Sequence, residues 1–152
     1  MIVLIKFIQN NYKTVLKFCE QQYPDYPEVC DRITRILAIY LKSKNHMKQI
    51  YMCCGNYKMR YHWWLEIDNK IIDITKFQFN CTDDEFNNRK FNLDFKIIAD
   101  DVNNYDLRFK TKTKFCGKFF SKYKQLIKVA SKSKSLDEYL NFIKLNDGIE
   151  FK

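Results

Sequence analysis

Three side chains in this sequence have the chemistry of a covalent catalytic site: the thiol of Cys30, the imidazole of His62 and the carboxylate of Asp73. A thiol attacks a carbonyl carbon when a neighbouring imidazole accepts its proton. A carboxylate can orient that imidazole and stabilise its charged form. The three residues are far apart along the chain, so the elements around them must bring them together.

His62 and Asp73 belong to a predicted β-hairpin. From Tyr57 to Asp68, apolar and polar residues alternate with the period of a strand. The pair Asp68-Asn69 predicts a two-residue turn, because both residue types tolerate left-handed backbone angles. The residues KIIDIT (70–75) then predict the second strand. The apolar row of the first strand is Tyr57, Met59, Tyr61, Trp63, Leu65 and Ile67.

The register of this hairpin decides whether His62 and Asp73 can meet. With the turn at positions 68 and 69, Trp64 lies opposite Asp73. His62 then lies opposite Thr75, and all four side chains share the face opposite the apolar row. A turn one residue later keeps this parity and moves Asp73 opposite Glu66, whereas a three-residue turn sends Asp73 into the core. A half-exposed hairpin whose polar face carries a His and an Asp by chance is the alternative.

Cys30 falls in the first turn of a predicted helix that runs from Pro27 to about Ser43. Proline is favoured in the first turn of a helix, and the apolar stripe that follows is Val29, Ile33, Ile36, Leu37, Tyr40 and Leu41. The unpaired amide N–H groups and the dipole at a helix start favour a thiolate. The alternative for a cysteine is a buried free thiol, and this is the interpretation of Cys19, Cys53, Cys54, Cys81 and Cys116.

The rest of the chain predicts helices at both ends and strands between them. The order helices, strands, helices favours an α+β fold with an antiparallel sheet. At 152 residues, a single domain over 1–152 is expected. The further predicted elements are helices over 3–21, 119–130 and 136–145, strands over 47–54 and 95–99, a turn at Gly55-Asn56, a loop over 76–92, and an irregular or lysine-rich strand segment over 100–118.

Two blocks of the sequence resemble the transglutaminase-like branch of the papain-like cysteine enzymes. Residues 62–66 have the pattern H-x-W-x-E, and residues 71–79 have the pattern I-I-D-x-T-x-x-Q-F, as in small bacterial and phage members. The helix block matches less fully, because Val29 replaces the usual small residue before the cysteine, although Thr34 fits. The resemblance covers roughly residues 26–80.

This resemblance implies Cys30 as nucleophile, His62 as general base and Asp73 as its orienting group, with Trp64 and Gln78 binding substrate. It also implies a papain-like or transglutaminase-like core, with the nucleophile helix packed on an antiparallel sheet and a helical C-terminal part. The implied chemistry is acyl transfer from an amide or ester of a protein or peptide, through a thioester, to water or an amine. The oxyanion-hole glutamine of the papain branch has no counterpart, because its position is occupied by Pro24.

A rival signal lies in residues 105–134. This segment has ten Lys or Arg residues and one acid, and so accounts for the whole net charge of +9. Lys110, Lys112 and Lys114 alternate as on one strand face, with aromatic residues interleaved, a pattern that can bind nucleic acid. The alternative function is therefore a basic binding protein for nucleic acid or an acidic protein partner, and a catalytically degenerate enzyme fold is one form that this alternative takes. A solvated lysine surface explains the same residues, since Lys outnumbers Arg 22 to 5.

Other chemistries are disfavoured by the composition. The chain has two histidines, no C-x-x-C pair and three glycines, so neither a metal site, a phosphate-binding loop nor any other cofactor is expected. The first residues combine an apolar run with Lys6 and lack a small-residue cleavage site, which argues against a signal peptide or a membrane span. Reduced thiols and a cytoplasmic location are expected.

Overall fold

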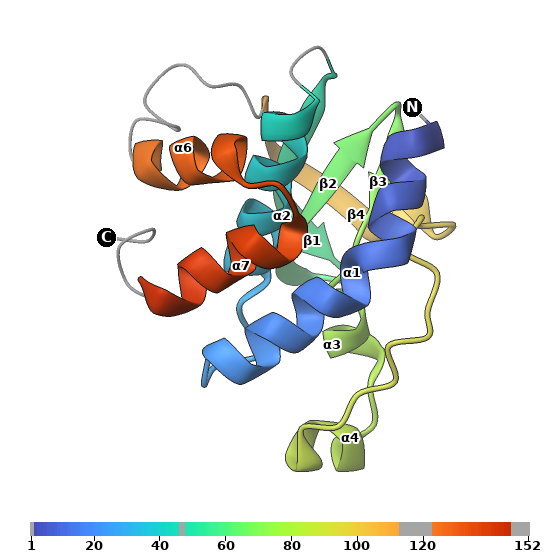
Figure 1. Cartoon of the computed structure of the whole chain (residues 1–152). Helices are drawn as coiled ribbons and strands as arrows, with labels where there is room; N and C mark the ends of the chain where they lie inside the picture. Colours follow the sequence, from blue (N-terminus) through green and yellow to red (C-terminus); the bar gives the residue numbers. More distant parts are fainter. Residues whose placement is uncertain (1, 46–47, 113–122, 147–152) are drawn as a thin grey trace.

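The computed structural model describes residues 2–45, 48–112 and 123–146, which form an α+β fold (Figure 1). The predicted α+β class and the antiparallel sheet are confirmed, and so are the N-terminal helix and the helix over 136–145; of the predicted helix over 119–130, residues 119–122 lie outside the described residues. The elements are α1 (Ile2–Gln22), α2 (Cys30–Lys44), β1 (Ile50–Tyr57), β2 (Arg60–Ile67), β3 (Lys70–Ile72), α3 (Phe77–Asn80), α4 (Asp83–Asn88), the 3₁₀ turn η1 (Val102–Asn104), β4 (Tyr105–Lys112), α6 (Lys124–Lys132) and α7 (Leu136–Leu145).

The described strands form one antiparallel sheet in the order β3-β2-β1-β4. Two-residue turns join β1 to β2 and β2 to β3, and all four turn residues have positive φ, between 48° and 68°. Such angles are those of the tight hairpin turns that match strand twist. The second turn is the predicted Asp68-Asn69 pair, and Ile67 lies opposite Lys70 as expected.

The first hairpin differs from the prediction. Gly55 and Asn56 lie inside β1, and the turn is made by Lys58 and Met59 instead. Tyr57 therefore ends β1 opposite Arg60, on the face that also carries His62. The glycine serves a close approach between strands and makes no turn. A Cβ at this position would lie 2.0 Å from the backbone oxygen of Asp106 in β4.

The core lies between α2 and one face of the sheet. Helix α2 packs on β1 and β2, and α1, α6 and α7 pack around it (Figure 1). Ile33 and Ile36 are fully buried against this layer, as are Leu65 and Ile67 of β2. The predicted apolar row does not stay buried along its whole length: Met59 lies in the first turn and is 95% exposed, and Tyr61, near the start of β2, is 59% exposed.

Helix α2 begins later than predicted. Two turns precede it, closed by the Tyr26 amide on the Tyr23 carbonyl (3.1 Å) and the Glu28 amide on the Asp25 carbonyl (2.7 Å). Pro27 lies in these turns and outside the helix. The Val29 carbonyl accepts the first helical bond. Cys30 is consequently the first residue of α2, even closer to the unpaired amide groups than the sequence indicated.

Two predicted segments between the sheet strands were assigned wrongly. Residues 95–99 form no named strand, although Ile98 makes an isolated bridge to Ile72. The predicted loop 76–92 contains α3 and α4. Thr82 and Glu85 cap α4 reciprocally, and the T-x-x-E spacing is a signal of a helix start that could have identified it.

Candidate active site

His62 and Asp73 form a buried pair. The Nε2 atom of the imidazole lies 2.8 Å from Oδ2 of the carboxylate, and the two side chains are 0% and 1% exposed. The paired part of β3 is shorter than predicted: pairing with β2 ends at Ile72, and the Asp73 amide donates to the Ile97 carbonyl on the other edge (2.8 Å). The hairpin register nevertheless directs both side chains to one face, where they meet.

Four donors surround the carboxylate of Asp73. Besides the imidazole, the Tyr105 hydroxyl donates to Oδ2 at 2.7 Å. The Thr75 amide and hydroxyl donate to Oδ1 at 3.0 and 3.3 Å. An ionised carboxylate can accept all of these bonds, so the surroundings hold a negative charge beside His62.

Cys30 contacts the same imidazole. Because Nε2 points at Asp73, Nδ1 is the nitrogen left to interact with the Cys30 thiol. Burial lowers the pKa of His62, but the charge and hydrogen bond of Asp73 and the hydrogen bond of Cys30 raise it to about 9. The charged pair therefore stabilises the fold fully below pH 6.5, the ordinary value, and this contribution is lost as the pH rises through about 9. Cys30 itself is a free, half-buried thiol.

Aromatic rings enclose His62. The ring centroids of Phe79, Tyr57 and Trp64 lie 4.7, 6.0 and 6.0 Å from that of the imidazole. Trp64 also packs edge-on against Tyr105 at 5.0 Å and is only 2% exposed. Trp64 lies next to His62 as expected, and its side chain is buried in this structure, so a substrate contact of Trp64 stays a prediction.

Sequence reasoning missed three neighbours of the pair. Tyr57 was assigned to the opposite face because the first turn was misplaced. Phe79 is the last residue of the 71–79 block, and its position there was a usable signal. Tyr105 reaches Asp73 from β4, and no local pattern indicates that pairing.

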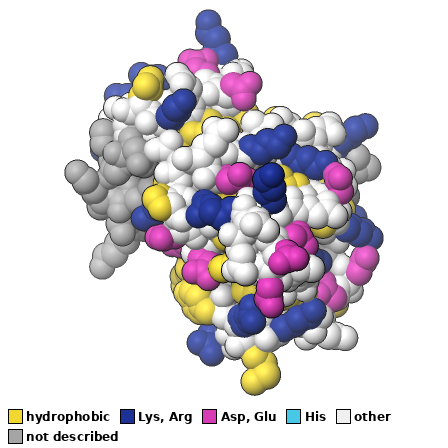
Figure 2. All heavy atoms as spheres, turned by 90° about the horizontal axis from the view of Figure 1, so that it is seen from below, with side chains coloured by type: hydrophobic (Ala, Val, Ile, Leu, Met, Phe, Trp, Pro, Cys, Tyr) yellow, Lys and Arg dark blue, Asp and Glu magenta, His cyan; other side chains and the backbone are white. Residues whose placement is uncertain are grey.

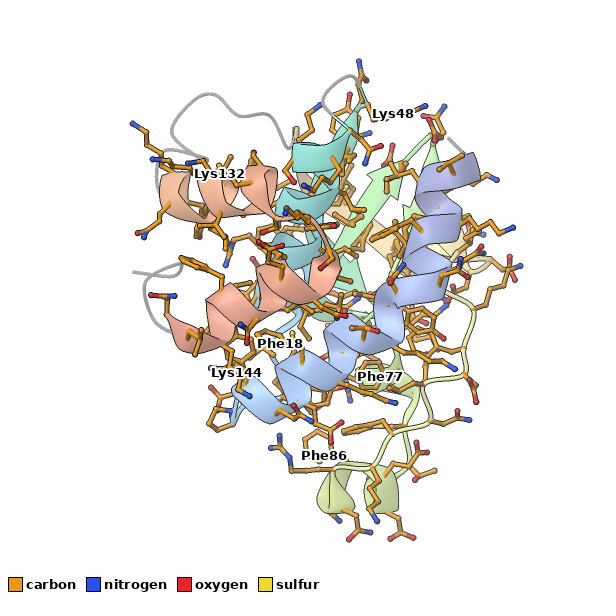
Figure 3. All side chains as sticks on the ribbon, viewed as in Figure 1. Phe18, Lys48, Phe77, Phe86, Lys132 and Lys144 are labelled. Atoms are coloured by element: carbon orange, nitrogen blue, oxygen red, sulfur yellow. The ribbon has the colours of Figure 1, made fainter. Side chains whose placement is uncertain are left out.

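Gln78 lies at the edge of the site. Its side-chain Nε2 is 3.4 Å from Nδ1 of His62, and it lines a cleft of about 300 Å³ that Glu28, two residues before α2, also lines. Figure 3 shows Phe86 on the side of α4 that faces the rest of the molecule. Seen from this end, basic and acidic side chains are interspersed over the surface (Figure 2). The cleft is lined by Glu28, Arg60, Gln78, Phe79, Cys81, Thr82, Asp83 and Phe86.

The basic segment is only partly described. Its residues 113–122, with Lys114, lie outside the described part of the chain. On β4, the Lys110 ammonium is 2.6 Å from a carboxylate oxygen of Glu66 and lies over the ring of Tyr51. This lysine is therefore already paired, and binding of nucleic acid or an acidic partner by residues 105–134 stays a prediction.

Replacing Tyr105 with Phe is expected to raise the pKa of His62 above its value of about 9. Tyr105 and His62 donate to the same oxygen of Asp73, so removing one donor strengthens the interaction with the other. Burial, and then the charge of Asp73, raise the pKa of the Tyr105 hydroxyl, which keeps its proton for this bond. Titration of the imidazole signals by NMR measures the shift, with His46 as internal control. An unchanged or lower His62 value would contradict the competition between the two donors.

The fold and the site together define an α+β protein with a helix-start thiol, an imidazole and a carboxylate in contact. Comparisons with protein-family models, curated proteins and solved structures find no match to this chain. In the described residues, no group of three or more His, Cys, Asp or Glu side chains could hold a metal ion. None of the described helices has the length and apolar character needed to cross a bilayer.

Proposed function

We propose that this chain is a cysteine-nucleophile hydrolase or acyltransferase of papain-like or transglutaminase-like type, acting on an amide or ester carbonyl. The observation that supports it is the buried 2.8 Å pair of His62 and Asp73, whose imidazole also bonds the free thiol of Cys30. The three residues come from α2, β2 and the segment after β3, and a nucleophile, a base and an orienting group require this order of contacts.

The reaction follows from these contacts. Cys30 transfers its proton to Nδ1 of His62, and the sulfur attacks the carbonyl carbon of the substrate. The carbonyl electron pair moves to oxygen, and when it returns, the bond to the leaving group breaks. His62 gives its Nδ1 proton to that group and leaves a thioester on Cys30. Water or an amine, deprotonated by His62, then attacks the thioester and releases the product and the thiolate.

Asp73 determines which nitrogen of His62 takes part. By accepting from Nε2–H it leaves Nδ1 to exchange the proton with sulfur. The rings around His62 exclude water and strengthen this interaction. The amide groups at the start of α2 favour the negative charge that develops on sulfur and on the carbonyl oxygen.

Alkylation by iodoacetamide near neutral pH is expected to modify Cys30 at least about tenfold faster than the other described cysteines. Burial raises the pKa of Cys19 and Cys53, the latter to about 12, and also that of Cys81. Cys54 is buried and bonds the Tyr61 hydroxyl. The modified residue is identified by peptide mass spectrometry.

Two variants complete this experiment. His62→Ala is expected to remove the fast reaction, because the thiolate loses its counter-ion, whereas Cys81→Ser is expected to keep it. Incubation with p-nitrophenyl acetate should then leave an acetyl group on Cys30. Equal labelling of all thiols in the unaltered chain would refute the catalytic proposal.

A further inference from the structure

We propose that the side-chain amide of Gln78 donates a hydrogen bond to the oxyanion formed when Cys30 attacks, and so supplies the donor for which the sequence showed no candidate. This inference rests on the proposed function and names a catalytic residue within it. The geometry that carries it is the position of this amide, 3.4 Å from the imidazole nitrogen that exchanges a proton with Cys30.

The segment that holds Asp73 also places Gln78. Thr75 donates twice to the carboxylate of Asp73. The Thr75 carbonyl also accepts a hydrogen bond from the backbone N–H of Gln78 at 3.2 Å. Phe77, beside Gln78, is buried in the core and fixes α3 (Figure 3). The backbone of Gln78 is therefore held in place relative to Asp73, and this keeps the Gln78 side chain next to the imidazole of His62.

The amide has no competing acceptor in the reactive state. In the charged pair, both nitrogens of His62 carry protons, and the Nδ1 proton points to sulfur. An imidazolium offers no lone pair, so the Gln78 N–H groups cannot donate to it. Within the described residues, the side chain of Gln78 has no other hydrogen-bond partner. Its donors are therefore available beside Cys30 when the tetrahedral intermediate forms.

Substrate can reach this amide. Gln78 is half-buried and lines the cleft of about 300 Å³, together with Phe79, whose ring contacts His62. Cys30 and His62 are not among the residues that line this cleft, so we place the carbonyl oxygen of the substrate between the Cys30 thiol and the Gln78 amide, next to Nδ1 of His62. The Gln78 amide donates to that oxygen as the π electrons move onto it, and the bond weakens when the carbonyl re-forms and the leaving group departs with the His62 proton. Donors placed in this way stabilise the transition state more than the substrate.

Two reactions of the same thiol separate this role from a structural one. Acetylation by p-nitrophenyl acetate passes through an oxyanion, whereas alkylation by iodoacetamide displaces iodide at an sp³ carbon and forms none. Gln78→Ala is expected to slow acetylation of Cys30 by about 10²-fold and to leave its alkylation within about twofold of the unaltered chain. Gln125→Ala, in an exposed position of α6, is the matched control and is expected to change neither rate.

Gln78→Glu keeps the shape of the side chain and removes the donor. The new carboxylate can still accept a hydrogen bond from the imidazolium. In this variant we therefore expect Cys30 to be alkylated at the normal rate and acetylated slowly. Fast acetylation in this variant, an equal loss of both reactions in Gln78→Ala, or no loss in either would overturn the inference. If the unaltered chain itself neither acetylates nor alkylates preferentially at Cys30, the proposed function fails first, and the two failures are thereby distinguished.

Discussion

Asp73→Asn is expected to slow acyl transfer at Cys30 by about 10³–10⁴-fold. The Thr75 amide holds one oxygen of Asp73, so a carboxamide there would turn its NH₂ group toward His62 and Tyr105. Two donors would then face each other, and His62 would adopt the tautomer with Nδ1 protonated. That tautomer cannot accept a proton from Cys30, and the charge that raises the pKa of His62 would be absent.

The measurement compares acetylation rates of the variant and of Asp106→Asn, a control at an exposed position of β4. Circular dichroism verifies that both chains are folded. The pKa of His62 should fall in Asp73→Asn, because burial, which lowers it, is then opposed only by Cys30. If Cys30 were acetylated as fast in Asp73→Asn as in Asp106→Asn, the proposal that Asp73 orients His62 would be wrong.

Gly55→Ala is expected to destabilise the fold by about 3 kcal/mol or more, the upper range for an overpacked site. The new Cβ would lie 2.0 Å from the Asp106 oxygen and 2.9 Å from the Trp64 ring. The first contact is with backbone, so no side-chain rotation relieves it. Strand β4 must shift away from β1, and Tyr105, at the start of β4, would lose its bond to Asp73.

Urea unfolding followed by tryptophan fluorescence measures this change, and Asn56→Ala, at the next position of β1, is the control. The control is expected to lose less than about 1 kcal/mol, since its site has no such backbone contact. The pKa of His62 in Gly55→Ala should also change, because the carboxylate of Asp73 loses the hydrogen bond from the Tyr105 hydroxyl. If the urea midpoint of Gly55→Ala equalled that of Asn56→Ala, the prediction would be wrong, since β1 and β4 would then accommodate a side chain between them.

The predictable part of this site is encoded locally. A two-residue turn fixes strand parity, and alternation around Asp68-Asn69 was enough to put His62 and Asp73 on one face. The region after Pro24 could hold no continuous helix, and this placed Cys30 near a helix start. The exact start was missed because the turn bonds of 23–28 are not visible in an apolar pattern.

The unpredictable part depends on contacts between distant segments. Gly55-Asn56 has the composition of a turn, yet Gly55 is required by the close approach of β4, which follows some fifty residues later. Trp64 was expected on a polar face, and it is buried because Tyr105 covers it. Both differences have one cause: β4 adds to the edge of β1, and single-sequence periodicity does not show which strands are neighbours.

The bond from Tyr105 to Asp73 has a consequence for synthesis of the protein. Cys30, His62 and Asp73 all leave the ribosome before Tyr105, and β4 can pair with β1 only after residue 105 and the residues that follow it have emerged. A nascent chain therefore carries the thiol and its two partners without the donor that completes the carboxylate's surroundings. Under the proposed function, Cys30 would therefore acquire its complete surroundings only after β4 has emerged and paired with β1.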